Sequence, residues 1–113
     1  MLLHGSGPGV SGWANYRGNL AAFAAHFTTY VLDMSGYGKS YPLDGNPFQV
    51  TGGILDFLDG LGLQALPMVG NSFGGAMAVR IAADHADRVS RLVTIGGVAS
   101  PCSALLRPRA SSC

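Results

Sequence analysis

Ser72 lies in a segment whose residue types suit nucleophilic chemistry. The segment GNSFG at residues 70–74 fits the pattern G-x-S-x-G, follows an apolar run and opens an Ala-rich stretch. A serine in a sharp strand-to-helix turn has a strained backbone, and the flanking glycines remove Cβ atoms that would clash there. Its hydroxyl then projects clear of the sheet, where the helix N-terminus stabilises a developing anion. The alternative is an ordinary helix N-cap, in which this serine accepts a backbone N–H.

A second glycine-rich turn, HGSGPG at residues 4–9, could complete an oxyanion hole. It follows a short apolar run and precedes the serine by about 65 residues. An oxyanion hole takes one backbone N–H from the residue after the nucleophile and another from such a loop, and these would be Phe73 and Ser6. Taken alone, the same glycines also fit a plain strand-to-helix turn.

The elements that would position these turns follow an α/β pattern. Short apolar runs alternate with longer Ala- and Leu-rich stretches, which is typical of βα units around a mostly parallel sheet. The pattern predicts strands at 1–3, 28–34, 66–71 and 91–97, and helices at 13–26, about 48–61 and 73–85. We expect a partial domain over residues 1–99 and an irregular tail over 100–113, where small polar residues and prolines show no period.

The composition excludes several classes of protein. Hydrophobic residues make up 48% of the 113-residue chain and charged residues 12%, which suits a buried core. The net charge is +1 and the basic residues are scattered, so no nucleic-acid partner is expected. No apolar run approaches the roughly 20 residues of a membrane span and no signal peptide is evident, so a cytoplasmic location is the default. Cys102 and Cys113 lack metal-site spacing, and we expect surface thiols or, in an oxidising compartment, a terminal disulfide.

Three segments resemble the α/β-hydrolase superfamily and, within it, the meta-cleavage product hydrolases, which break a C–C bond in ring-opened aromatic compounds. These segments are LLHGSGPGVSGWANYRGNL at 2–20, DMSGYGKS at 33–40 and GNSFGGAMAVRIAADHADRVSRLV at 70–93. The serine-bearing turn GNSFG at residues 70–74, called the elbow below, and the D-x-x-G-x-G-x-S stretch at 33–40 are superfamily-wide. More specific are HGSGPG followed by GWANY, and an asparagine directly before the serine.

The resemblance implies a site of six residues and a small-molecule substrate, with no metal or organic cofactor. The residues are the nucleophilic or water-activating Ser72, the oxyanion-hole N–H donors Ser6 and Phe73, and the substrate-binding Asn15, Asn71 and Gly5. Local hydrogen bonding in turns is the alternative for the two asparagines.

A base for the serine is not evident. In this fold an acid and then a histidine follow the nucleophile along the chain. After Ser72 the chain offers only Asp84, His85 and Asp87, which a dozen helical residues would place about 18 Å away. A serine without its base is a weak nucleophile.

Three residues that precede Ser72 in the sequence also do not fit the role of acid or base. His26 precedes the serine, Asp33 is expected in a turn, and His4 is expected to make structural hydrogen bonds.

Relative to the family, the chain is expected to be truncated at both ends and to hold strands 3 to 6 of the sheet in the spatial order 4-3-5-6. Its exposed edges predict aggregation.

Three functional hypotheses remain open. The first is a fragment of a serine-dependent hydrolase that cleaves a C–C bond in 2-hydroxy-6-oxo-dienoates. The second is an ester, lactone or other acyl hydrolase of the same fold. The third, for the isolated chain, is a catalytically inactive remnant. Haloalkane dehalogenases are disfavoured because their nucleophile is an aspartate.

Overall fold

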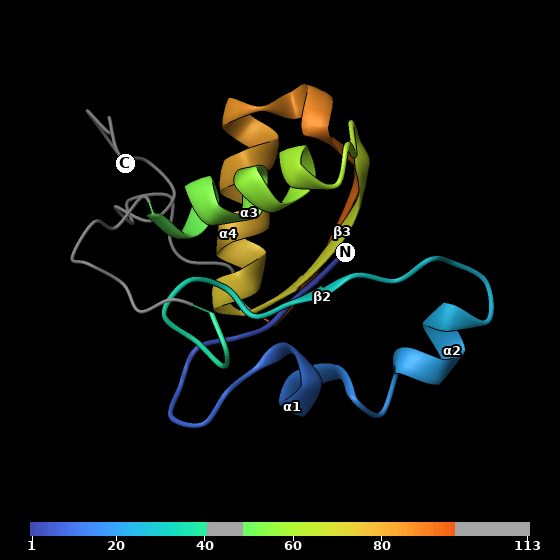
Figure 1. The fold of residues 1–113 in the computed structure, drawn as a ribbon, viewed down its shortest axis with the longest axis vertical. Coiled ribbons are helices and arrows are strands. Elements are labelled where there is room, and N and C mark those ends of the chain that lie inside the picture. Colours follow the sequence, from blue (N-terminus) through green and yellow to red (C-terminus); the bar gives the residue numbers. More distant parts are fainter. Residues whose placement is uncertain (41–48, 97–113) are drawn as a thin grey trace.

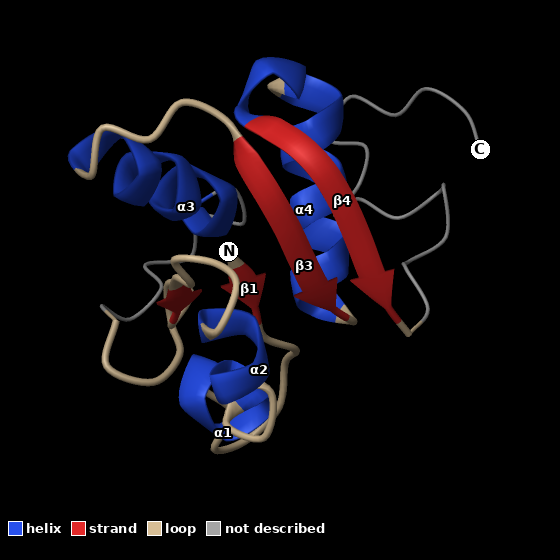
Figure 2. Cartoon of the chain, turned by 90° about the vertical axis from the view of Figure 1, so that its right-hand side faces the viewer, coloured by secondary structure: helices blue, strands red, loops and turns tan. Residues whose placement is uncertain are grey.

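The sheet is parallel and has the strand order that the resemblance implies. The computed structural model describes residues 1–40 and 49–96. Within these residues four strands form one sheet in the order β2-β1-β3-β4 (Figure 2). They are β1 (Leu2–Leu3), β2 (Val31–Leu32), β3 (Leu66–Asn71) and β4 (Val89–Ile95). This order equals 4-3-5-6 in the family's numbering, so the predicted α/β fold class is confirmed.

Helices lie on both sides of the strands. They are α1 (Gly12–Tyr16), α2 (Leu20–Ala24), α3 (Gln49–Gly60), α4 (Phe73–Asp84) and the short 3₁₀ helix η1 (Ala86–Arg88). Figure 1 shows α3 and α4 on one side of the sheet and α1 and α2 on the other. None of the helices in the described part of the chain is long and apolar enough to cross a membrane.

The core lies between the sheet and the pair α3 and α4. Its fully buried side chains include Leu3, Met34, Ile54, Leu58, Met68, Met77 and Ile81. Burying side chains of this size stabilises the fold by about 1.5–3 kcal/mol each. The Met1 amino group donates to Pro67 O (2.8 Å) and so continues the pairing of β1 with β3, and its burial lowers the pKa of this amine.

Two of the predicted elements are wrong in their extent. The helix expected at 13–26 is two short helices, because the chain turns at 17–19 with a hydrogen bond from Asn19 N–H to Tyr16 O (2.8 Å). Gly18 lies in this turn, and glycine is among the poorest helix formers. The strand expected at 28–34 pairs only through Val31 and Leu32, because its neighbour β1 offers just two residues.

The other predictions agree with the structure to within a few residues. β4 begins at Val89, two residues earlier than expected, and α3 and α4 begin and end within a residue of their predicted bounds. β4 exposes about half of Val93 and of Ile95, which is consistent with the predicted aggregation but does not test it. The proposed tail, the domain boundary at residue 99 and both cysteines lie outside the described residues.

Candidate active site

Ser72 lies between β3 and α4 in a strained backbone conformation. Its φ of 53° and ψ of −109° make it the one non-glycine residue with positive φ in the described part of the chain. Its side chain is exposed and makes no capping hydrogen bond to α4, so the geometry of an ordinary N-cap is absent. Strain of this kind costs about 1–3 kcal/mol and concentrates at functional sites.

The glycines around Ser72 let three pieces of backbone approach each other closely. A Cβ on Gly70 would lie 2.5 Å from Gly75 N, and one on Gly74 would lie 2.5 Å from His4 O. Real Cβ atoms do not approach backbone atoms this closely. The pattern G-x-S-x-G is therefore a steric requirement of the strand-to-helix turn, as the sequence predicts.

The two predicted oxyanion-hole donors lie at the ends of adjacent strands. Ser6 is exposed in the loop after β1, and Phe73 is the first residue of α4. In the described residues neither backbone N–H has a hydrogen-bond acceptor. A Cβ built on Gly5 would lie 3.8 Å from Cβ of Ser72, so the loop passes directly beside the serine. The oxyanion-hole role of the two amides stays a prediction.

Asn15 links the loop to the elbow. Its Oδ1 accepts hydrogen bonds from Gly5 N–H (2.9 Å) and from Asn71 Nδ2 (3.0 Å). The structure thus brings together the three residues that the resemblance assigns to the substrate site. The Gly5 N–H is occupied by Asn15, whereas the next amide, that of Ser6, has no acceptor among the described residues. The bonds of Asn15 span 10 and 56 residues of chain, which is more than local turn bonding.

His4 is a structural residue, as expected. Its side chain is fully buried, Nε2 accepts a hydrogen bond from Met34 N–H (3.0 Å), and Nδ1 lies 2.7 Å from Gly5 O. Since Nε2 is an acceptor, Nδ1 carries the proton and donates it to Gly5 O. Both ring nitrogens are therefore used by backbone groups, and neither can accept the proton of the serine.

Asp33 organises the turn after β2. Its carboxylate accepts hydrogen bonds from Gly12 N–H (2.7 Å) and Lys39 N–H (3.1 Å), and its carbonyl accepts one from the Ser40 hydroxyl. Burial opposes ionisation and is the largest single influence, but the two N–H groups and the nearby side chains of His4 and Lys39 together outweigh it, so the pKa of Asp33 is lowered. This agrees with the expected role in a turn.

No histidine of this chain is placed to activate Ser72. The chain has three histidines, and all lie in the described residues. His26 follows α2, which lies well apart from the beginning of α4 (Figure 1), and His85 follows the far end of α4, about 18 Å along the helix from the serine. Asp84 at the same end pairs with Arg80 (2.6 Å).

Tyr16 contacts the two strands that lead into the candidate site and is not among the residues predicted from the sequence. Its side chain is 3% exposed, and its hydroxyl donates to Leu3 O (2.8 Å) and lies 3.5 Å from Val69 O. Burial raises the pKa of Tyr16 to about 12, against a smaller opposing effect of the Asn71 backbone. The only sequence signal is its place after Asn15 in GWANY, which does not reveal that its hydroxyl reaches two strands.

A shallow groove borders the loop that carries Ser6. Its volume is about 440 Å³, and it is lined by residues 7–11 and 36–38. Among residues 1–40 and 49–96 no group of three acids, histidines or cysteines could hold a metal ion.

Comparisons with known proteins agree with this geometry. The α/β hydrolase fold family matches residues 1–110. A 2-hydroxy-6-oxononadienedioate/2-hydroxy-6-oxononatrienedioate hydrolase of Pseudomonas sp. is 42% identical over 103 residues, which cover 86% of this chain and 35% of that protein. A 2-hydroxy-6-oxo-2,4-heptadienoate hydrolase of Pseudomonas putida is 39% identical over 101 residues, covering 87% of this chain and 37% of that protein.

Solved structures show the same relationship. A meta-cleavage product hydrolase from Pseudomonas fluorescens superposes with a TM-score of 0.76 at 33% identity, covering 80% of this chain and 35% of that one. A serine hydrolase from Cycloclasticus zankles, a bacterium that degrades polyaromatic hydrocarbons, gives 0.82 at 30% identity, covering 90% and 38%. The chain thus spans little more than a third of the length of these relatives. With its parallel sheet, strained serine and glycine-rich loop, the chain belongs to the α/β hydrolase fold family.

Proposed function

We propose that this chain is the nucleophile-bearing part of a serine-dependent hydrolase that cleaves a C–C bond in 2-hydroxy-6-oxo-dienoates. The observation that carries the proposal is the link from Asn71, directly before the strained Ser72, through Asn15 to the loop HGSGPG. This arrangement joins the segments most specific to the meta-cleavage product hydrolases. The names of the relatives point to the same substrates.

The reaction would use the residues of this chain at the distal ketone of the substrate. After ketonisation of the dienol, Ser72 or a water that it activates would add to the carbonyl carbon. The backbone N–H groups of Ser6 and Phe73 would stabilise the resulting oxyanion. Cleavage of the C–C bond gives a 2-hydroxydienoate, which takes up a proton, and a carboxylic acid, which takes up the hydroxyl of water.

The proposed activity requires a base from outside this chain, because none of its histidines reaches Ser72. The activity therefore belongs to a longer protein or an assembly that supplies one, and the isolated chain is proposed to be inactive. A cytoplasmic location and the absence of a nucleic-acid partner stay part of the proposal.

A hybrid enzyme tests this function. Residues 1–96 replace the matching part of the Pseudomonas hydrolase that is 42% identical, and hydrolysis is followed by loss of the dienoate's absorbance. We expect turnover in the hybrid and its loss on Ser72→Ala, while Ser90→Ala, which removes an exposed hydroxyl on β4, serves as the matched control. A folded hybrid without dienoate hydrolysis, or one unaffected by Ser72→Ala, would contradict the proposal.

Ester hydrolysis is the second candidate, because the elbow and the two amides suit any acyl transfer. The same hybrid, offered a nitrophenyl ester and a dienoate at equal concentrations, separates the two reactions. A higher kcat/KM for the ester would favour the acyl hydrolase.

A further inference from the structure

Tyr16 joins the two strands that lead into the proposed oxyanion hole. Its hydroxyl donates to the carbonyl of Leu3, the last residue of β1, and lies 3.5 Å from the carbonyl of Val69 in β3. Three residues beyond Leu3 the chain reaches Ser6, and four residues beyond Val69 it reaches Phe73. One phenol oxygen thus contacts both strands shortly before their N–H donors.

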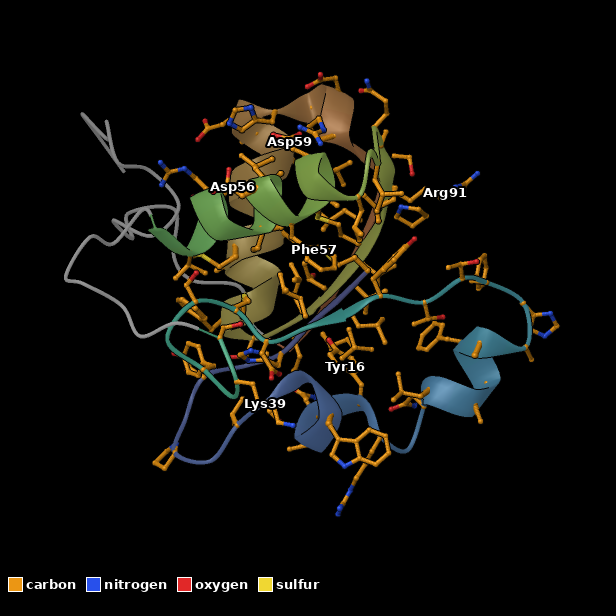
Figure 3. The ribbon with its side chains drawn as sticks, viewed as in Figure 1. Tyr16, Lys39, Asp56, Phe57, Asp59 and Arg91 are labelled. Atoms are coloured by element: carbon orange, nitrogen blue, oxygen red, sulfur yellow. The ribbon has the colours of Figure 1, made fainter. Side chains whose placement is uncertain are left out.

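The side chain is held firmly enough to act as a spacer. Tyr16 is 3% exposed, and Figure 3 shows it between α1 and the strands. Its raised pKa keeps the hydroxyl protonated, so it remains a hydrogen-bond donor over the whole physiological range of pH. A buried tyrosine with its hydroxyl bonded to backbone has little freedom to move.

The preceding residue makes a second link in the same direction. Asn15 accepts hydrogen bonds from Gly5 in the loop and from Asn71 in the elbow. Asn15 and Tyr16 are consecutive residues of the five-residue helix α1. Asn15 connects the turns that follow β1 and β3, and Tyr16 connects the two strands just before these turns.

We infer that Tyr16 is a positioning residue that sets the separation of the Ser6 and Phe73 amides. This inference rests on the proposed function. An oxyanion hole works only when both donors lie about 2.7–3.1 Å from the developing anion. A displacement of about 1 Å caused by a change elsewhere can cost on the order of 100-fold in rate.

The test compares Tyr16→Phe with Tyr30→Phe in the active hybrid. Tyr30 is half-buried, packs against Phe57 and has no side-chain hydrogen bond within the described residues, so its hydroxyl is a matched control. We expect Tyr16→Phe to lower kcat by about tenfold with KM changed less than about twofold, since the donors are misplaced but not removed. Tyr30→Phe should leave both constants unchanged.

Hydrogen exchange followed by mass spectrometry gives a readout that does not depend on turnover. Faster exchange in Tyr16→Phe confined to residues 4–6 and 71–73 is the expected result. An unchanged kcat with a lowered melting temperature, or faster exchange spread evenly over β1, β3 and the core, would show a purely structural residue and overturn the inference. A failure of the proposed function is distinct from this, because it appears as a folded but inactive parent hybrid.

Discussion

Gly74→Ala is the substitution for which the structure makes the sharpest quantitative prediction. The new Cβ would lie 2.5 Å from His4 O and closer still to Leu3 O. Both neighbours are backbone atoms at the end of β1, so they cannot turn away as a side chain would. α4 and β1 must separate by about 1 Å, and overpacking of this kind costs typically 1–3 kcal/mol.

Gly52→Ala is the matched control. Gly52 also lies inside a helix, α3, but a Cβ there would meet nothing within 4 Å among residues 1–40 and 49–96. Replacing a helical glycine with alanine in open space stabilises by about 0.5–1 kcal/mol. The same chemical change should therefore have opposite signs at the two positions.

Thermal unfolding of the hybrid enzyme measures both effects. In the hybrid, which is more than twice as long as this chain, about 1 kcal/mol shifts Tm by ~2–4 °C. Gly52→Ala should therefore raise Tm slightly, and Gly74→Ala should lower it by several degrees. Because the shift moves β1 against the elbow, Gly74→Ala should also lower kcat. Equal Tm values for the two variants would refute the argument that this glycine is required by close backbone packing.

Three further predictions concern strain and pH. Ser72→Gly and Ser72→Ala should both abolish turnover, but the glycine variant should melt higher because glycine adopts a φ of 53° without strain; a lower Tm for glycine would contradict the strained elbow. The folded pKa of Asp33 is depressed, so its contribution to stability is present above its unfolded pKa of about 3.9 and is lost as pH falls through the folded value. Asp33→Asn should therefore reduce the loss of Tm between pH 6 and pH 3, and an unchanged acid profile would count against it. In the 113-residue chain the buried Met1 amine has a lowered pKa, so the unfolded state binds more protons and stability should rise with pH up to about 8. A one-residue N-terminal extension keeps the hydrogen bond to Pro67 but removes the charge, and urea titrations from pH 6 to 8 should then lose this slope.

The elbow could be predicted from the sequence because its requirements are local and steric. Gly70 and Gly74 tolerate no Cβ, and the apolar strand and the helix on either side are each visible as a pattern. The four parallel strands could be predicted for the same reason, since each is a short apolar run that ends in a turn.

The break near Gly18 and the role of Tyr16 could not be predicted in this way. A glycine inside an Ala-rich stretch costs only about 1 kcal/mol, which tertiary contacts can offset or reinforce. Here the Tyr16 hydroxyl donates to Leu3 O in β1. Predicting this contact requires knowing which strands are neighbours. The extent of β2 depends likewise on its partner, since β1 offers only two residues for pairing.

The strain at Ser72 persists because the residue is held from two sides. Its N–H donates to Ile95 O in β4 (2.8 Å), and its carbonyl accepts from Ala76 N–H in α4 (3.0 Å). Two hydrogen bonds of about 0.5–1.5 kcal/mol each are comparable to the ~1–3 kcal/mol that the conformation costs. The bond to β4 also connects Ser72 to a strand that flanks the elbow on the side away from β1. The position of the serine is therefore determined by α4 and β4, whereas the position of the facing loop is determined by α1. The geometry of the proposed site depends on how β1 and β3, which lie between these elements, are placed relative to each other.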